Sequence, residues 1–252
     1  MKNIIITGAA SGIGRATAEL LVKHDWHIGL LDINREALLE LQGRIGKDNC
    51  DIQICDVTRS AELKTAIDNY VASAGQLDAI FNCAGIMDIA PFENIPLERH
   101  HLAIDINIRG VLDGFYFAFP HLKKRPQAWA VTMSSASSVY GIPSLANYSA
   151  TKFWVKGMTE ALNIEWKQHG IHVTAVEPSF VKTPLLKGND SKIIDSMGVN
   201  LQAEDIAEVV LKSLNSQKIH HVVGLKYGTM RLLRKLLPNF CTAWLIRTLA
   251  GY

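Results

Sequence analysis

Residues 3–14, with the sequence N-I-I-I-T-G-A-A-S-G-I-G, decide the fold of this chain. A short apolar run ended by Gly8 is typical of a buried parallel strand, and the spacing of Ala16 and Leu20 behind Gly14 indicates a helix. Glycines between such a strand and helix let the backbone turn tightly and approach a pyrophosphate at the positive end of the helix dipole. The G-x-x-x-G-x-G spacing therefore predicts a dinucleotide-binding loop, with a glycine-rich turn that binds no ligand as the alternative.

The next apolar run ends in Asp32. A carboxylate there can accept hydrogen bonds from both hydroxyls of an adenosine ribose and repels a 2′-phosphate. Ile33 follows it, and Ser11 rather than a basic residue precedes Gly12, so the sequence favours NAD(H) over NADP(H). Arg35 is near enough to keep NADP(H) as the less favoured alternative.

Apolar runs and helical patterns alternate along the rest of the chain. Strands are expected at residues 27–32, 50–55, 77–83, 128–134, 171–177 and 219–223, and helices at 36–45, 61–74, 96–119, 148–168 and 203–214. This alternation predicts an α/β fold, a single-domain, Rossmann-type, doubly wound parallel sheet with helices on both faces. In a chain of 252 residues without a linker, residues 1–228 should form the dinucleotide-binding and catalytic domain, and residues 229–252 an extension of that same domain.

The reactive groups are concentrated in residues 135–152, S-A-S-S-V-Y-G-I-P-S-L-A-N-Y-S-A-T-K. Tyr148 and Lys152 are four residues apart and share one face if this segment is helical. A phenol titrates at about 10 and a neighbouring ammonium favours the phenolate, so we expect Lys152 to lower the pKa of Tyr148. Ser135, at the end of the preceding strand, could reach the same place. These three groups suit carbonyl–alcohol redox chemistry, although the bare Y-x-x-x-K pattern more often marks a solvated helix face.

Small and polar residues stand at the carboxyl ends of other expected strands, where open α/β sheets bind ligands. Asp56 could hold an adenine amino group or cap the helix that follows it. Residues 82–85 (N-C-A-G) suit close passage of a ligand, and backbone groups around Val181 with the Thr183 hydroxyl could meet a nicotinamide carboxamide. Residues 187–199 are polar and punctuated by glycine, which suits a mobile substrate lid.

Asn107 lies among apolar neighbours such as Ile106 and Ile108, so its amide is expected to be buried. A buried amide must find hydrogen-bond partners. Two roles stay open: a structural one, and a proton relay in which Asn107 holds a water against Lys152.

The bulk composition, 48% hydrophobic and 20% charged, is that of an ordinary globular protein. A net charge of +2 argues against nucleic acid as the main partner. The four cysteines show no paired spacing, so neither a metal site nor a disulfide framework is expected. No apolar run approaches the roughly 20 residues of a transmembrane helix, and no cleavable signal is evident, so we expect a cytoplasmic protein that could still associate with a membrane surface.

Taken together, residues 3–223 resemble the short-chain dehydrogenase/reductase family. The matching motifs, in the order and spacing of the family, are T-G-x-x-x-G-I-G at Thr7, Asp32, Asp56-Val57, N-x-A-G at Asn82, Asn107, Ser135 and Y-x-x-x-K at Tyr148. The resemblance implies an enzyme in which Tyr148 is the acid/base and Ser135 steadies the substrate oxygen. It also implies that Lys152 lowers the tyrosine pKa and binds the nicotinamide ribose, and that Asn107 organises a relay water.

The expected cofactor-binding residues are Gly8, Ser11, Gly12, Ile13, Gly14, Asp32, Asp56, Val57, Asn82, Ala84, Gly85, Tyr148, Lys152, Pro178, Val181 and Thr183. Two positions depart from the family pattern. Cys83 replaces an asparagine, with little expected effect, and Ser179 replaces the glycine that usually follows Pro178, which reduces backbone freedom beside the nicotinamide. The resemblance further implies a homodimer or homotetramer with residues 96–119 and 148–168 at the interface.

The expected substrate pocket consists of Met87, Ile89, Ala136, Ile142, Leu145, Phe180, Leu185 and Leu186. This set is apolar and has no arginine to clamp a carboxylate, which favours a hydrophobic alcohol or ketone over a sugar. The expected function is hydride transfer between NAD(P)(H) and such a substrate. The alternatives are a non-catalytic NAD(H)-sensing regulator or scaffold, which would require a lost catalytic group, and an epimerase or dehydratase, for which 252 residues leave little room.

Residues 229–252 extend beyond the family resemblance. Their expected apolar faces are Leu232, Leu233, Leu236 and Leu237, opposite Arg231, Arg234 and Lys235, followed by Phe240, Trp244, Leu245 and Leu249. From Lys212 onward the chain has seven Lys/Arg and no Asp or Glu, which leaves −5 for the first 211 residues. Three roles stay open: a helix packed on its own subunit or a dimer mate, a lid over an apolar substrate, and a membrane-surface anchor.

Overall fold

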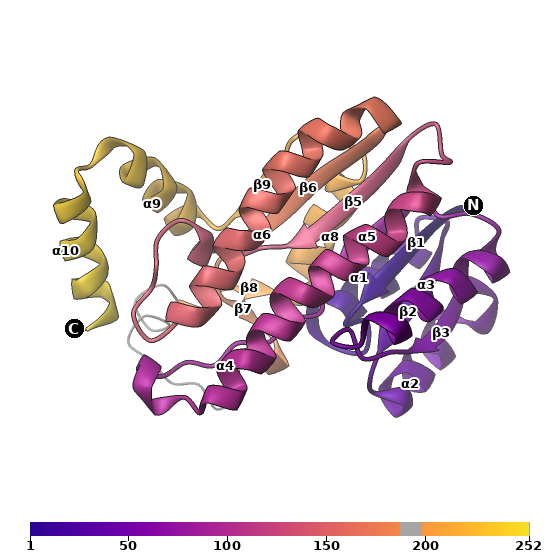
Figure 1. Ribbon diagram of the computed structural model, residues 1–252, viewed down its shortest axis with the longest axis horizontal. Coiled ribbons are helices and arrows are strands. Elements are labelled where there is room, and N and C mark those ends of the chain that lie inside the picture. Colours follow the sequence, from indigo (N-terminus) through magenta and orange to yellow (C-terminus); the bar gives the residue numbers. More distant parts are fainter. Residues whose placement is uncertain (187–197, 252) are drawn as a thin grey trace.

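The computed structural model describes residues 1–186 and 198–251 (Figure 1). Its main sheet has seven parallel strands in the order β3-β2-β1-β4-β5-β6-β9. Their bounds are β1 Lys2–Thr7, β2 Trp26–Asp32, β3 Cys50–Ile54, β4 Ala79–Asn82, β5 Ala128–Met133, β6 Ile171–Pro178 and β9 His220–Val223. A short parallel pair, β7 (Val181–Lys182) and β8 (Leu201–Gln202), lies outside it. The expected lid at residues 187–199 falls almost wholly outside the described residues.

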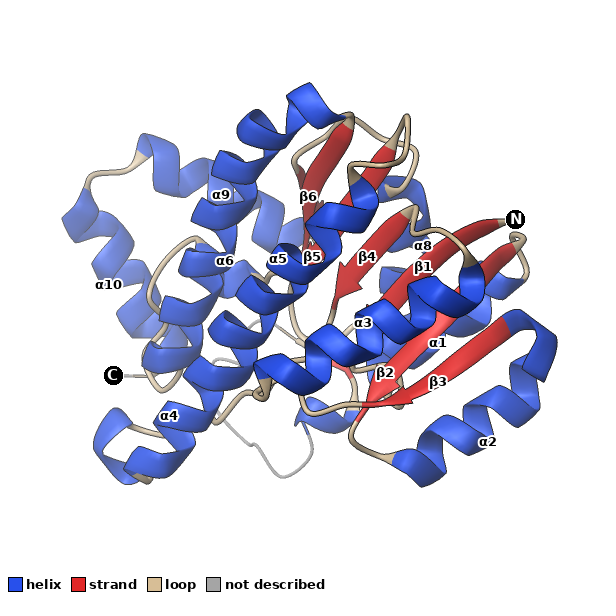
Figure 2. Ribbon diagram, turned by 45° about the vertical axis from the view of Figure 1, so that its right-hand side comes forward, coloured by secondary structure: helices blue, strands red, loops and turns tan. Residues whose placement is uncertain are grey.

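Helices cover both faces of the sheet, which confirms the doubly wound fold. One core cluster joins the sheet to α1 (Gly12–Val22), α2 (Arg35–Ile45) and α8 (Ala203–Ser213). A second joins the opposite face to α3 (Ser60–Ala74), α5 (Val111–Leu122) and α6 (Ala146–Glu165), which Figure 2 shows in front of the strands. Neighbouring residues of β1 divide between the two clusters, with Ile4 and Ile6 in one and Ile5 in the other, because strand side chains alternate. Short 3-10 turns occupy Lys47–Asn49, Phe92–Asn94, Ala136–Ser138, Trp166–His169 and Pro184–Leu186.

The helical stretch expected at residues 96–119 is divided into α4 (Leu97–Ile104), a π-helical turn at Asp105–Gly110, and α5. Such turns add a residue to the helix and are frequent at functional sites. Here the π turn contains Asn107, which is fully buried.

The C-terminal extension consists of α9 (Leu225–Leu236) and α10 (Asn239–Ala250). The expected boundary at residues 228 and 229 therefore falls inside α9. Tyr227, Met230 and Ile246 are buried, so the extension packs on its own subunit. Of the four leucines expected on one apolar face, Leu232 and Leu236 are exposed to solvent, whereas Leu233 and Leu237 are partly buried.

Candidate active site

The glycine loop after β1 is shaped by close approaches that exclude larger residues. A Cβ on Gly14 would lie 2.2 Å from the Gly8 carbonyl oxygen, and a Cβ on Gly8 would lie 2.9 Å from the Ala84 Cα. Gly8 and Gly12 also have positive φ angles of 69° and 51°, which favour glycine. Thr7 joins this loop to the N-C-A-G segment, since its hydroxyl accepts hydrogen bonds from the amides of Cys83 and Ala84 at 3.1 Å each.

Asp32 lies at the end of β2 with both carboxylate oxygens facing the loops. Oδ2 accepts the Ala10 amide and Oδ1 accepts the Asn34 amide, each at 3.0 Å. A carboxylate has about four acceptor positions, so these bonds leave capacity for a ligand hydroxyl. Arg35 is exposed and absent from the residues that line the adjoining cleft.

Asp56 does not cap α3, the helix that follows it in the chain. Its Oδ1 accepts the Thr58 amide at 2.9 Å and the Thr58 hydroxyl at 2.8 Å, whereas α3 begins after Arg59. Of the two roles left open, only the one at the cleft agrees with its position, because Asp56 and Val57 both line that cleft. Val57 also packs against Gly110 of the π turn, where a Cβ would lie 3.0 Å from its Cγ2.

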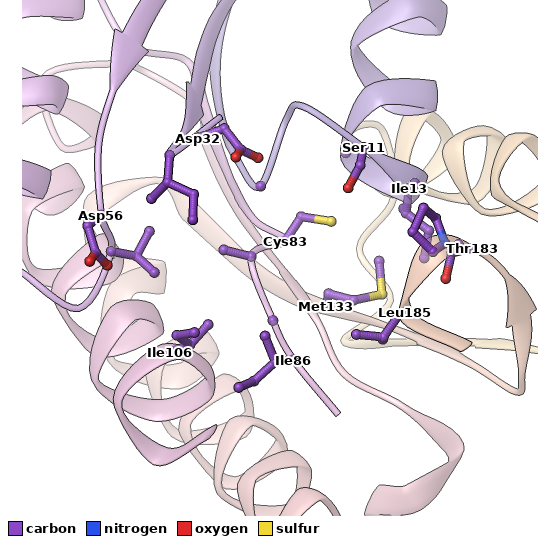
Figure 3. Close-up of a pocket in the computed structure, with 18 of the residues that line it drawn as sticks. Ser11, Ile13, Asp32, Asp56, Cys83, Ile86, Ile106, Met133, Thr183 and Leu185 are labelled. Atoms are coloured by element: carbon purple, nitrogen blue, oxygen red, sulfur yellow. The ribbon is translucent and has the colours of Figure 1, made fainter. Parts of the chain in front are cut away.

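A single cleft at the carboxyl ends of the strands gathers most of the expected cofactor residues (Figure 3). It is lined by the expected Gly8, Ser11, Gly12, Ile13, Gly14, Asp32, Asp56, Val57, Ala84, Gly85, Tyr148, Lys152 and Thr183, and by Ile33, Cys55, Cys83, Ile86, Ile106, Met133, Pro184 and Leu185. Figure 3 shows Asp32 and Asp56 on one side of this cleft and Thr183 on the other.

Three expected residues do not line the cleft. The Asn82 side chain turns toward α5, where a Cβ on Gly114 would lie 2.2 Å from its Oδ1. Pro178 ends β6 in the buried sheet, and Val181 is buried in β7. Cys83 faces the cleft in place of Asn82 because side chains alternate along extended backbone. This alternation could have been used to predict from the sequence that only one of the two neighbouring residues faces the cleft.

Tyr148, Ser135 and Lys152 come together as expected. Ser135 follows β5, and its side chain lies near enough to the Tyr148 phenol on α6 to lower the pKa of that phenol slightly. The Lys152 ammonium is 5.5 Å from the centre of the Tyr148 ring and donates a 2.8 Å hydrogen bond to the Met133 carbonyl. Lys152 is only 3% exposed, so this bond compensates part of its lost hydration.

The pKa of Tyr148 differs from the expectation. Burial raises it to about 12, against a smaller lowering by the nearby Ser135 side chain. Burial likewise lowers the pKa of Lys152 to about 8. The expected lowering of the phenol pKa by Lys152 was therefore wrong for this arrangement, because the ammonium is directed to Met133 and desolvation dominates at the phenol.

Asn107 has buried partners for both of its functional groups. Its Nδ2 donates to the Ile86 carbonyl at 2.9 Å and to the Thr151 hydroxyl at 3.2 Å, and its Oδ1 accepts the Ile86 amide at 2.9 Å. These hydrogen bonds connect the π turn to Thr151 of α6 and to Ile86, the residue after Gly85. Asn107 therefore has the structural hydrogen bonds expected of a buried amide. Its role in holding a relay water against Lys152 stays a proposal.

An apolar pocket adjoins Ser135. It is lined by Ser135, Ala136, Ser137, Ile142, Ser179, Phe180 and Met230. Of the expected substrate residues, Met87, Ile89, Leu145 and Leu186 belong to the apolar cluster around it, which also contains Tyr148, and Leu185 lines the dinucleotide cleft instead. Sequence reasoning missed Met230, since only the path of α9 brings it beside Ser135.

The cleft fits a dinucleotide. The glycine cradle has no room for a Cβ at Gly14, and the N-terminus of α1 opens onto it. Among the described residues, Ser11 makes no side-chain cap bond there, so the first amides of α1 are available to a phosphate.

Comparisons with known proteins agree with this geometry. Residues 2–193 match the family model described as short chain dehydrogenase. The chain is 34% identical over 188 residues to a 2,5-dichloro-2,5-cyclohexadiene-1,4-diol dehydrogenase of Sphingobium indicum, covering 74% of this chain and 75% of that one. It is 31% identical to a mitochondrial borneol dehydrogenase of Lavandula x intermedia, covering 88% and 86%.

Among solved structures, a 3-ketoacyl-(acyl-carrier-protein) reductase from Brucella melitensis complexed with NADH superposes with a TM-score of 0.82 at 28% identity. The match covers 88% of this chain and 96% of that one. The family match, the sequence identities and the shared architecture agree, and a nicotinamide dinucleotide is the cofactor that they support. The chain is an oxidoreductase of the short-chain dehydrogenase family.

Proposed function

We propose that this protein transfers a hydride between NAD(H) and the carbon of a hydrophobic alcohol or ketone, with Tyr148 as the acid/base. The observation that carries the proposal is the position of Tyr148. It lines the dinucleotide cleft, belongs to the apolar cluster, and lies near enough to Ser135 of the apolar pocket for Ser135 to affect its pKa. An acid/base at the junction of a cofactor site and a substrate site is what carbonyl–alcohol redox chemistry needs.

The protonation states favour a proton donor at neutral pH. With a pKa of about 12, the Tyr148 phenol is protonated and can give its proton to a substrate carbonyl oxygen. Ser135 supplies a second hydroxyl to that oxygen. In the oxidative direction the same phenol must first lose its proton, so alkaline pH favours alcohol oxidation. Lys152, whose ammonium is 5.5 Å from the centre of the phenol ring, would bind the nicotinamide ribose. Asn107 holds α6 in place through its hydrogen bond to the Thr151 hydroxyl.

The cofactor would be held by the glycine loop, by Asp32 at the ribose and by Asp56 at the adenine side, and it supplies the redox step when bound. NAD is favoured over NADP because Asp32 would oppose a 2′-phosphate. Arg35, the basic residue nearest to Asp32 in the sequence, is exposed and does not line the cleft.

For the substrate, the apolar lining supports a compact hydrophobic alcohol or ketone. Both curated relatives described above are named for cyclic alcohols, which agrees with such a pocket. We further propose a homodimer or homotetramer. Leu112 and Tyr116 on α5 are 41% and 71% exposed, and Phe153 and Ile164 on α6 are 43% and 76% exposed, so both helices offer an apolar face to a second copy. We propose a cytoplasmic location, with membrane contact confined to the C-terminal extension.

The test is NADH formation at 340 nm from NAD and a panel of cyclic and linear secondary alcohols, and the reverse reaction with the matching ketones. We expect Tyr148→Phe to lower kcat by at least about 100-fold, the lower end of what a positioned acid/base contributes. Tyr116→Phe loses an exposed phenol on α5 and is the matched control, expected to keep wild-type rates. Undiminished turnover in Tyr148→Phe would refute the mechanism, whereas NAD binding without turnover of any panel member would favour the regulator.

A further inference from the structure

The C-terminal extension presents large apolar side chains to solvent. Leu232 and Leu236 on α9 are 58% and 70% exposed, and Phe240 and Trp244 on α10 are 75% and 68% exposed. Each pair is four residues apart and so lies on one face of its helix. Single exposed apolar residues are ordinary, but four of this size on two consecutive helices indicate a contact surface, called here the outer face.

The outer face is not needed for packing inside the subunit. The extension is anchored by other side chains, Tyr227, Met230 and Ile246, which are buried on its inner side. Figures 1 and 2 both place α9 and α10 at the end of the molecule opposite β3 and α2. Since the four side chains of the outer face are exposed, they are accessible to a partner at that end.

The charge of the extension indicates the chemistry of that partner. Residues 225–252 contain five Lys/Arg and no Asp or Glu, so the remaining 224 residues carry −3. Arg231 is 3.4 Å from the buried Glu177 carboxylate, which offsets one of the five charges. Exposed apolar side chains on a segment of net positive charge match the apolar interior and the anionic headgroups of a lipid surface, where Trp and Phe prefer the boundary.

A second copy of the chain is a poorer occupant. Two-fold pairing through the outer face would bring two basic segments against each other, and like charges oppose such an interface. The apolar faces of α5 and α6 offer a copy another place to bind.

We propose that the outer face of α9 and α10 docks this protein peripherally on an anionic lipid surface. Met230, on the inner side of α9, lines the apolar pocket beside Ser135. Docking would therefore bring that pocket close to the lipid, in which apolar substrates dissolve. The docking itself requires no turnover. None of the helices in the described part of the chain is long and apolar enough to cross a membrane.

The experiment is co-sedimentation of the full chain with vesicles of phosphatidylcholine containing phosphatidylserine, at low and high salt, beside vesicles of phosphatidylcholine alone. We expect binding to the anionic vesicles that weakens with salt. The double variant Phe240→Ser/Trp244→Ser should lower that binding at least about tenfold, since it removes the two rings that would enter the lipid. Leu39→Ser, which changes a 46% exposed residue on α2, is the control expected to bind like wild type.

Leu232→Ser/Leu236→Ser provides a second test on α9, should the first double variant fold poorly. The proposal would be overturned if the wild-type protein did not bind anionic vesicles. It would also be overturned if both double variants bound these vesicles as tightly as the wild type. Loss of an oligomer in these variants without any vesicle binding would assign the outer face to a second copy and overturn it as well. Tyr148→Phe should sediment like wild type, so failure of the proposed enzyme mechanism and failure of docking are distinguishable.

Discussion

The buried carboxylate of Glu177 fastens α9 to the sheet, and its removal should destabilise the fold. Glu177 is the residue before the last in β6 and has no exposed surface. Its Oε2 accepts the Tyr227 hydroxyl at 2.5 Å and lies 3.4 Å from Arg231, and its Oε1 lies 2.7 Å from His220 Nδ1. Burial alone would raise the pKa of Glu177, but its contacts with His220 and Tyr227 outweigh burial and lower that pKa. The carboxylate is thus ionised at neutral pH.

The variant Glu177→Gln keeps the shape and removes the charge. Hydrogen bonds to a charged group contribute roughly 1.5–3 kcal/mol each. The upper figure for the Tyr227 hydrogen bond gives about 3 kcal/mol, near the low end of the cost of breaking a buried pair. His220 Nδ1, which lies 2.7 Å from Oε1 without the geometry of a hydrogen bond, adds nothing to this figure. We add nothing for Arg231, which is partly exposed and more distant. A loss of about 3 kcal/mol corresponds to a fall in Tm of about 6–12 °C for a chain of this size.

Thermal unfolding followed by circular dichroism measures this, with Glu160→Gln as the matched control. Glu160 contacts the same histidine at 3.0 Å but is half exposed, so we expect its loss to cost less than about 1 kcal/mol. Because the folded pKa of Glu177 is lowered, its stabilisation is present above the unfolded value of 4.5 and is lost as pH falls through the folded value. A Tm of Glu177→Gln equal to that of the control at pH 7, or a difference from wild type that does not narrow in acid, would refute this reasoning.

Three further predictions concern the cleft and the pocket. Gly14→Ala places a methyl 2.2 Å from a backbone oxygen, so it should weaken NADH binding at least about tenfold by fluorescence titration; unchanged binding would contradict the cradle. Asp32→Ser removes the carboxylate that opposes a 2′-phosphate and should raise kcat/KM with NADP relative to NAD by at least about tenfold; an unchanged ratio would place the discrimination elsewhere. Met230→Trp narrows the apolar pocket, so KM for bulky alcohols should rise while the affinity for NADH, measured separately, is kept; equal KM values would remove Met230 from the pocket.

The hydrophobic spacing in the sequence predicted most of the helices and strands, but not the π turn that divides one of the helices. The strand at residues 128–134 and the helix at 203–214 were confirmed within a residue or two, because alternating and helical hydrophobic spacings reflect which side chains a sheet or helix buries. The π turn at Asp105–Gly110 was missed, since the apolar spacing continues through it and only packing shows the extra residue. The division expected between residues 228 and 229 falls inside α9, which is one continuous helix.

The sequence by itself determined the glycine loop, the Asp32 position and the pairing of Tyr148 with Lys152, since each depends on residue type at a fixed short spacing. Only the tertiary structure decided whether the pKa of Tyr148 is raised or lowered. That shift depends on desolvation of the phenol and on the hydrogen bond of Lys152 to the Met133 carbonyl, nineteen residues away in the chain. The tertiary structure also decided the placement of Met230 and of Glu177 with Tyr227, fifty residues apart, because such contacts form only when the sheet and the C-terminal helices fold together.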